Sequence, residues 1–406
     1  MRGINVENLI LERSIFERTQ IEKRMYDGGF NSIAKFELFV WDIEVFLQLQ
    51  KRLGDMIILK GGAAAQFYLP IPAQRTSIDI DMICTASHNE LHKAISEIEA
   101  VLNGGEDYCM FKIHKPKNPK LGLETLETYY LKIPSICEEK ELYSSKGKQE
   151  VKVEFMFSDH VYPIGRIKQP KLFALETELE FNVLALEYLF ADKLTTLGPT
   201  TIGIPNDRAD EQFKQIYDVT TLFISNIDQV LSNKELIREY YRQAAMEECQ
   251  IRNIPYNQDQ LLQDMYKVIS RLKSIESNNH MLQLANDFQS LYLRKAVNRD
   301  KAQWAIVGYQ LELLINYIFK DDMRILRFRD ILKLIEKLEF NGIRGPERGH
   351  LLKEIRNVLE SDFGAMADLS ADITKKRMDR IIWELVSVVS LETVERSLLP
   401  VFPNKR

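Results

Sequence analysis

Two aspartates two residues apart, Asp79 and Asp81, are the residues of this sequence that most directly suggest chemistry. They lie in the segment 77–83, where polar and apolar residues alternate with a period of two, which predicts a β-strand. The two carboxylates would then share one face, close enough to hold a divalent cation. Mg²⁺ favours one or two carboxylates together with phosphate oxygens, and two such ions assist nucleotidyl transfer. The alternative is a solvated strand face that carries two acids.

A Gly-Gly turn precedes the two aspartates. Residues 55–59 form a short apolar run that predicts a buried strand, and this strand ends at Lys60, Gly61 and Gly62. Glycines let the backbone approach a phosphate closely, and the following short helix offers free N–H groups. We therefore expect the turn to bind the phosphates of a nucleotide, with Arg75 adding a contact, although a turn of this kind can serve only as a turn.

A third carboxylate on a neighbouring strand would complete a site for two metal ions. The segment 150–157 alternates like a strand and places Lys152 and Glu154 on one face. Glu154 is therefore the candidate third metal ligand. An exposed strand face with Lys and Glu is the alternative.

The elements that must position these residues fall into two parts. Residues 6–26 and 30–52 have helical patterns, and strand and helix patterns then alternate, which describes a small mixed sheet with helices packed on it. Beyond about residue 225 strand signals nearly vanish and amphipathic helices follow one another. We expect an α+β fold with a first domain over residues 1–224, whose first 52 residues are helical, and an all-helical domain over residues 225–406.

Composition places the chain among ordinary cytoplasmic proteins. Its 406 residues are 45% hydrophobic and 28% charged, which suits two folded domains rather than a disordered chain. The net charge of −5 excludes a strongly basic nucleic-acid binder but permits a local basic patch. The four cysteines are far apart, and no apolar stretch has the length of a signal peptide core or of a membrane span. We expect no membrane partner.

Two histidines, His88 and His92, are four residues apart at the start of a predicted helix and would share a face. A zinc site needs a third ligand, and none is evident in the sequence, because Glu90 is at the wrong offset for a His-Glu-x-x-His motif. We interpret the pair as a solvated helix end.

Four segments, in order, resemble the nucleotidyltransferase motifs of the AbiEii/AbiGii toxin family. They are Leu59-Lys-Gly-Gly62, Arg75-Thr-Ser-Ile-Asp-Ile-Asp81, Leu189-Phe-Ala-Asp-Lys-Leu-Thr-Thr-Leu197 and Phe213-Lys-Gln-Ile-Tyr-Asp-Val219. Together they extend over residues 55–222, about 40% of the chain. Two departures from the family pattern are Ile78, where an acid is frequent, and Lys214-Gln215, where Arg-Asp is common.

This resemblance implies a polymerase-β-like nucleotidyltransferase domain followed by a helical domain. It also implies a Mg²⁺-dependent (or Mn²⁺-dependent) enzyme that transfers NMP from an NTP to RNA and releases pyrophosphate. Such enzymes are toxins of bacterial toxin–antitoxin or abortive-infection systems. The expected acceptor is the 3′ end of tRNA, and an antitoxin is an expected partner.

The resemblance also assigns roles to single residues. Asp79 and Asp81 would be metal ligands, Lys193 would contact the nucleotide phosphates, and Asp218 would be the late acidic residue of the active site. Ser77 would contact phosphate and is the hydroxyl that an antitoxin kinase would modify. From the residues alone, Lys193 could instead be a surface lysine, and Asp218 could cap its helix or pair within it.

Two other functions use the same residues. The acceptor could be a protein hydroxyl or a small molecule such as an aminoglycoside, which the acidic net charge slightly favours. A degenerate transferase could also serve as a binding module, with the helical half holding a partner.

Overall fold

A computed structural model of the chain describes residues 5–103, 110–114, 125–143, 149–338, 345–363 and 377–402. Their packing defines two compact units, one within Met1–Leu261 and Leu284–Asn298, the other within Leu262–Gln283 and Arg299–Arg406. These units are defined by packing alone, so the domain boundary expected after residue 224 stays a prediction.

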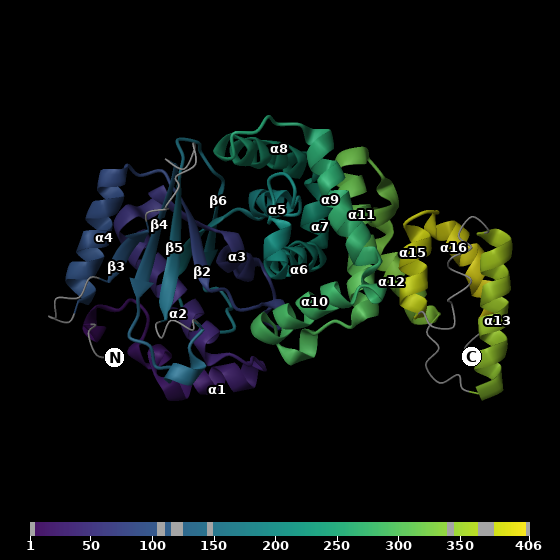
Figure 1. Cartoon of the computed structure of the whole chain (residues 1–406), viewed down its shortest axis with the longest axis horizontal. Coiled ribbons are helices and arrows are strands. Elements are labelled where there is room, and N and C mark those ends of the chain that lie inside the picture. Colours follow the sequence, from purple (N-terminus) through teal and green to yellow (C-terminus); the bar gives the residue numbers. More distant parts are fainter. Residues whose placement is uncertain are drawn as a thin grey trace. The chain divides into compact units, whose positions relative to one another are not determined.

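A mixed sheet organises the first unit. Its described strands follow the order β3-β4-β5-β2-β1-β7-β6 (Figure 1). They are β1 (Ile57–Lys60), β2 (Asp79–Cys84), β3 (Phe111–His114), β4 (Leu126–Lys132), β5 (Glu150–Phe157), β6 (Ile164–Lys168) and β7 (Glu180–Leu184). β2 pairs in antiparallel fashion with β1 and in parallel with β5, so the strand of the two aspartates lies inside the sheet. The sequence predicts β1 to β5 but not β6 and β7.

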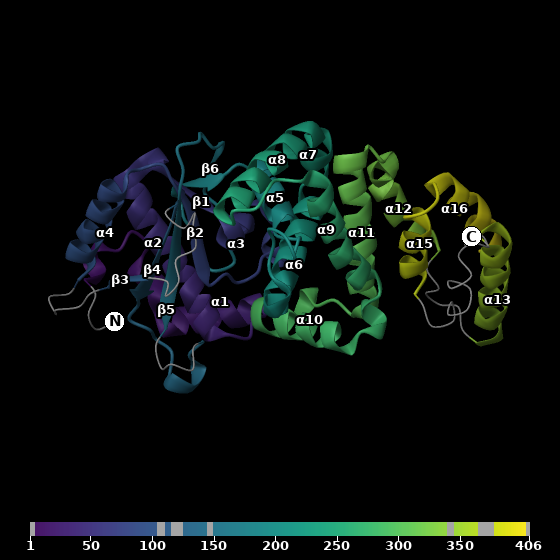
Figure 2. The ribbon, with the colours of Figure 1, turned by 45° about the horizontal axis from the view of Figure 1, so that its top comes forward.

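Helices α2 (Ile33–Leu53) and α4 (His88–Leu102) lie on one side of the sheet, as both ribbon views show (Figures 1 and 2). α2 begins at Ser32, whose side chain accepts a hydrogen bond from the Lys35 N–H, and almost all of its residues are buried. α1 (Arg18–Gly28) precedes it, and residues 6–17 contain only short 3₁₀ turns. The helix expected from residue 6 is therefore wrong before Arg18.

The other side of the sheet carries the helices that follow it in sequence. These are α5 (Leu186–Thr195), α6 (Ala209–Ser225), α7 (Ile227–Ser232) and α8 (Lys234–Ile251), together with the short α3 (Gly61–Ala65). α5 is buried nearly all round and packs on α3, α6 and α8. This mixed sheet with its helices confirms the α+β class.

The described part of the second unit is helical. α11 (Lys301–Lys320) is its most buried helix and packs against α15 (Met378–Val386). The other helices are α12 (Phe328–Lys337), α13 (Gly345–Asp362) and α16 (Leu391–Leu398), while α9 (Gln258–Lys273) and α10 (Asn279–Tyr292) each belong partly to both units. Amphipathic patterns after residue 225 thus correctly indicate helices.

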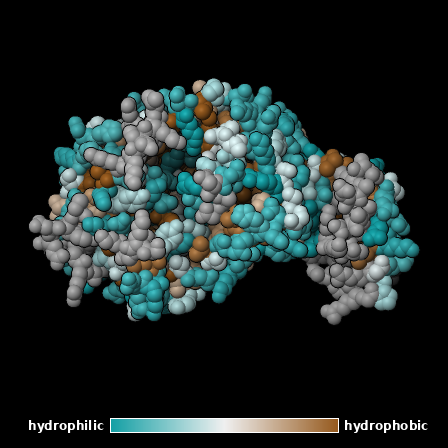
Figure 3. Space-filling view, in the orientation of Figure 1, coloured by the Kyte–Doolittle hydropathy of each residue, from teal (hydrophilic) through white to brown (hydrophobic). Residues whose placement is uncertain are grey.

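The surface view in Figure 3 is mostly hydrophilic, with apolar residues in small groups. Exposed apolar side chains of this kind are normal for a folded protein. Among the described residues, no helix combines the length and the apolar character that a membrane crossing requires.

Candidate active site

Three carboxylates come together on one face of β2 and β5. The parallel pairing places Asp79 beside Lys152 and Asp81 beside Glu154 in register. Because side chains alternate along a strand, residues paired in this way share a face. All three carboxylates line one cavity of about 530 Å³. The predicted pair and the predicted third acid therefore lie together, and Glu154 is not on an outer strand face.

The charges of these carboxylates are only partly balanced. Burial raises the pKa of Asp81 to about 6, and the neighbouring carboxylates of Glu154 and Asp79 add to the rise. Burial also raises the pKa of Asp79, where Lys152 and Lys214 act in the opposite direction. Carboxylates that repel one another in a buried place are suited to a divalent cation, which would replace repulsion by attraction.

Glu154 has two further contacts. It forms an ion pair with Lys152 and accepts a hydrogen bond from the Thr128 hydroxyl at 3.3 Å. Lys152 thus occupies the cation position nearest to Glu154, and it would have to turn aside if Glu154 bound a metal ion.

The Gly-Gly turn touches the carboxylates directly. Gly61 has φ +71°, and a Cβ there would lie 2.2 Å from a carboxylate oxygen of Asp81. A Cβ on Gly62 would lie 2.8 Å from the Arg75 guanidinium and 3.1 Å from the Ser77 hydroxyl. Gly61 is therefore required by the close approach of β2, and Gly62 leaves room for the side chains of Arg75 and Ser77. The following helix has only five residues, so its dipole adds little.

Arg75, Lys193 and Asp218 form a buried ion cluster at the edge of the cavity. Asp218 accepts two hydrogen bonds of 2.7 Å from Arg75, and the Lys193 ammonium lies 2.9 Å from the same carboxylate. Burial by itself would raise the pKa of Asp218, but Arg75 and Lys193 outweigh it and hold the pKa below its usual value. Arg75 and Lys193 line the cavity, whereas Asp218 lies behind them and is fully buried.

This cluster decides between the alternatives left by the sequence. Lys193 is 3% exposed and also donates to Gln215 at 2.9 Å, so it is not a surface lysine. Asp218 does pair, but with residues from two other elements rather than within its own helix. Its carboxylate is occupied by two cations, which makes it a positioning residue for Arg75 and Lys193.

Lys60 is held in a second ion pair. Its ammonium lies 3.1 Å from Asp192, the residue before Lys193. Burial alone would lower the pKa of Lys60, but Asp192 raises it above the usual value. Lys60 is thus a charged group in the cavity wall.

Several cavity residues are not anticipated by the sequence. Arg208 and Lys214 come from the start of α6, Arg252 follows α8, and Tyr292 ends α10. The Lys214 ammonium lies 4.4 Å from the centre of the Tyr292 ring, a cation–π contact. Lys214 lies in the fourth motif without an expected role in the site, and no motif marks the other three positions, because only tertiary packing brings α8 and α10 to the sheet. The cavity therefore has an acidic floor on β2 and β5 and a wall in which basic residues outnumber the acids Asp192, Glu211 and Glu248.

Comparison with known proteins gives the family. The family model described as "Nucleotidyl transferase AbiEii toxin, Type IV TA system" matches residues 46–296. The chain belongs to this family. The chain is thus a nucleotidyltransferase of the AbiEii toxin family, and the expected class of enzyme is confirmed. The match also extends well beyond the four motifs, over every residue that lines the cavity.

Two nucleotidyltransferases are among the solved structures to which this chain is similar. A putative nucleotidyltransferase from H. pylori is 14% identical, with a TM-score of 0.32, and the alignment covers 70% of this chain and 95% of that one. MenT4, a nucleotidyltransferase toxin from Mycobacterium tuberculosis H37Rv, is 11% identical, with a TM-score of 0.39 and coverage of 68% and 99%. A comparison with curated protein sequences gives no match to this chain.

Proposed function

We propose that this AbiEii-family enzyme transfers the nucleoside monophosphate of an NTP to RNA, with the 3′ end of tRNA as acceptor, and thereby inhibits growth. The observation that carries the proposal is the acidic floor of Asp79, Asp81 and Glu154 facing a basic wall across one cavity. Nucleotidyl transfer needs both charges, because the triphosphate is anionic and divalent cations accompany it.

The acidic floor fits Mg²⁺ or Mn²⁺. Its donors are all carboxylate oxygens, and burial, with the nearby carboxylates of Glu154 and Asp79, raises the pKa of Asp81. Asp79, Asp81 and Glu154 would hold the ion or ions, which when bound would polarise the reacting phosphate and stabilise the leaving oxygen. The three side chains thereby fix where the phosphate to be attacked can lie.

The basic wall would hold the rest of the triphosphate. Lys193 and Arg75 are held rigidly by Asp218, so they enter the cavity as oriented donors with little entropy left to lose. Gly61 and Gly62 keep the space between this wall and β2 open. Pyrophosphate would leave along the wall, with its charge compensated by the same side chains.

A labelling experiment tests the proposal. Purified protein is incubated with Mg²⁺, total tRNA and each of the four NTPs labelled at the α-phosphate, and the products are separated on a denaturing gel. We expect label in the tRNA band from at least one NTP. Asp81→Ala should abolish the label and relieve growth inhibition. Asp159→Asn, which changes an exposed acid outside the cavity, should still label tRNA and still inhibit growth. Absence of label in every RNA with the wild-type enzyme would contradict the proposal.

A second acceptor class is distinguished in the same experiment. Label that appears on the protein itself, or on an added aminoglycoside but not on tRNA, would assign a protein hydroxyl or a small molecule as the acceptor. Intact-mass measurement after incubation with NTP alone detects the first case as the addition of one nucleotide. The site chemistry on β2 and β5 would be the same in both.

We also propose that an antitoxin can act through Ser77. The Ser77 hydroxyl lines the cavity near Gly62 and is 6% exposed. A phosphoryl group on it would occupy the space beside Arg75 that nucleotide phosphates need. Ser77→Asp should therefore abolish NTP labelling, while Ser77→Ala should retain a measurable part of it. Equal loss in both variants would contradict this use of Ser77.

A further inference from the structure

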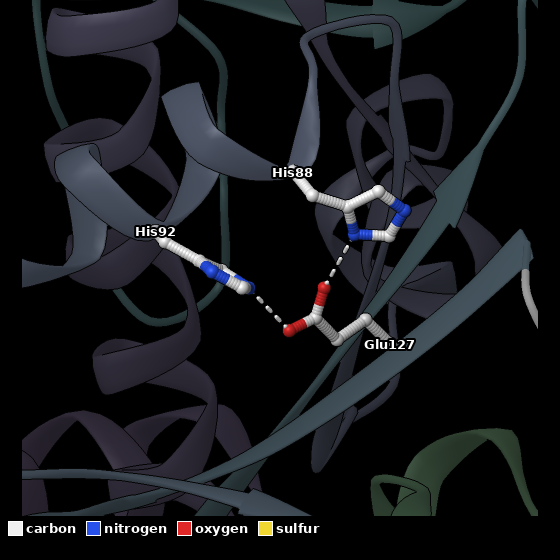
Figure 4. A group of neighbouring side chains, drawn as sticks. All are labelled: His88, His92 and Glu127. Atoms are coloured by element: carbon white, nitrogen blue, oxygen red, sulfur yellow. Dashed lines mark hydrogen bonds and ion pairs between the residues drawn. The ribbon is translucent and has the colours of Figure 1, made fainter.

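A second polar cluster lies away from the cavity. His88 and His92, in the first turns of α4, both point at the carboxylate of Glu127 on β4 (Figure 4). The His88 Nδ1 atom lies 3.0 Å from one oxygen of Glu127, and the His92 Nε2 atom lies 2.7 Å from the other. The sequence shows the histidine pair but no third ligand, because Glu127 is 35 residues from His92 in the chain.

This cluster faces the opposite side of the sheet from the catalytic carboxylates. In the pairing of β4 with β5, Thr128 is opposite Glu154 and Glu127 is opposite Phe155. Alternation along β4 then turns Glu127 away from the face of Glu154 and toward α4. The sheet separates the two groups, so the cluster is no extension of the acidic floor.

The three side chains are held in place by their surroundings. Ser87 and Glu90 form a capping box that fixes the start of α4, and the His88 ring packs on Phe157 with 3.8 Å between ring centres. The Tyr129 hydroxyl donates to Glu127 at 2.6 Å. These contacts fix the orientation of the Glu127 carboxylate.

Two imidazoles and one carboxylate are a ligand set for Zn²⁺ and similar ions. The three ligand atoms lie within 4.8 Å of one another. Tetrahedral zinc, with bonds of about 2.0–2.1 Å, places neighbouring ligand atoms roughly 3.3 Å apart. Small rotations of the rings would thus open enough room for the ion. Imidazole ligands favour zinc and its neighbours in the first transition row over Mg²⁺.

We propose that His88, His92 and Glu127 form a binding site for Zn²⁺, or for another divalent first-row transition metal, which cross-links α4 to β4. Each imidazole would give its ring lone pair to the ion and carry its one proton on the other nitrogen. Tyr129 would orient the carboxylate from behind, as partners of metal ligands commonly do. Both histidine side chains are about half exposed, at 53% and 50%, so solvent can supply the remaining ligand.

Metal titration of the full chain tests the site. Chelator-treated protein is titrated with Co²⁺, followed by visible absorption, and then with Zn²⁺ as competitor, in buffer with excess Mg²⁺ to occupy the acidic floor. We expect one equivalent of Co²⁺ with the absorption of a four- or five-coordinate ion, displaced by Zn²⁺. Zn²⁺ at 100 times its Kd should also raise the Tm of the unit that contains the site by roughly 5 °C.

Variants locate the binding. The double variant His88→Gln with His92→Gln should lose the Co²⁺ band and the Tm rise, and Tyr129→Phe should weaken binding about 10-fold. His280→Gln, which removes an exposed histidine elsewhere, is the matched control and should bind like wild type. Circular dichroism confirms that each variant is folded.

Three results would overturn the proposal. Wild-type protein could take up no Co²⁺ or Zn²⁺ at micromolar concentrations, which would leave Glu127 as a hydrogen-bond clamp between α4 and β4. The double variant could retain the equivalent of metal. Alternatively, Asp81→Asn could remove it, which would place the ion on the acidic floor. None of these results would contradict nucleotide transfer, which the labelling of tRNA tests separately, so the two proposals can fail independently.

Discussion

Carboxylates at the floor and at the wall of the cavity have opposite surroundings. On the floor of the cavity, Asp79 and Asp81 lie beside another acid, and burial and mutual repulsion raise the pKa of both. At the wall, Asp218 is fully buried, more so than Asp79 and Asp81, but it is enclosed by Arg75 and Lys193, which lower its pKa. A buried carboxylate without enough cations is suited to receive one from outside, whereas a paired carboxylate positions the cations it already has.

Substitution of the floor should affect catalysis and spare folding. For Asp81→Asn we expect the rate of nucleotide transfer to fall roughly 10³-fold or more, because stabilisation of charge by metal amounts to several kcal/mol. Thermal unfolding should occur at an unchanged or higher temperature, because one source of repulsion is removed. A variant whose Tm is much lower than that of wild type would contradict this prediction, since Asp81 would then be a structural residue.

Substitution of Asp218 at the wall should, in contrast, destabilise the fold. Asp218→Asn leaves two buried cations without their anion, and we expect a loss of about 3–5 kcal/mol in the free energy of unfolding. Urea denaturation measures this loss directly. Gln212→Ala, at the same helix but outside the ion cluster, provides a control for general damage to α6. Stability like that of wild type in Asp218→Asn would show that the cluster is not tightly coupled.

Glu154 has features of both the floor and the wall. It lies in the floor but already pairs with Lys152. If Glu154 is a metal ligand, Glu154→Gln should reduce the transfer rate by about 10–100-fold and raise the Mg²⁺ concentration needed for half-maximal rate. Lys152→Gln is the control for loss of the ion pair alone. An equal rate loss in both variants, without any change in Mg²⁺ dependence, would place Glu154 with the positioning residues.

Asp42 gives the smallest expected effect. It lies on α2, on the side of the sheet opposite the acidic floor, and is fully buried. Among the described residues, neither of its carboxylate oxygens has a hydrogen-bond partner. Burial raises its pKa well above the usual value, and the nearby charges of Asp79 and Asp81 add to this. Asp42→Leu should therefore stabilise the fold by about 1 kcal/mol in urea denaturation. A destabilised variant would indicate that Asp42 is needed where it is.

Local pattern was sufficient for the parts of the site that lie on one element. Alternation along 77–83 places Asp79 and Asp81 on one face, because the strand period of two is a local property of the backbone. The Gly-Gly turn and the helices after residue 225 follow from equally local preferences. The family match then adds the functional class, a nucleotidyltransferase toxin family, which these patterns do not specify by themselves.

Strands β6 and β7 show where local pattern fails. Both are short, and the sequence around them lacks a distinct alternation. β7 pairs with β6 along its whole length and joins the rest of the sheet through β1, the strand that leads to the Gly-Gly turn. These pairings supply hydrogen bonds that the residues of β7 do not specify by themselves.

Two aspartates on a strand after a Gly-Gly turn, and membership of a family of nucleotidyltransferase toxins, follow from the order of residues in the chain. Which acid pairs with cations of the protein, and which lies beside other acids, follows from the packing of distant segments. This packing brought Arg75 and Lys193 to Asp218, and Glu127 to the two histidines of α4. The physical reason is that a side chain's charge environment is set by neighbours in space, and these neighbours are separated by up to 143 residues in the chain.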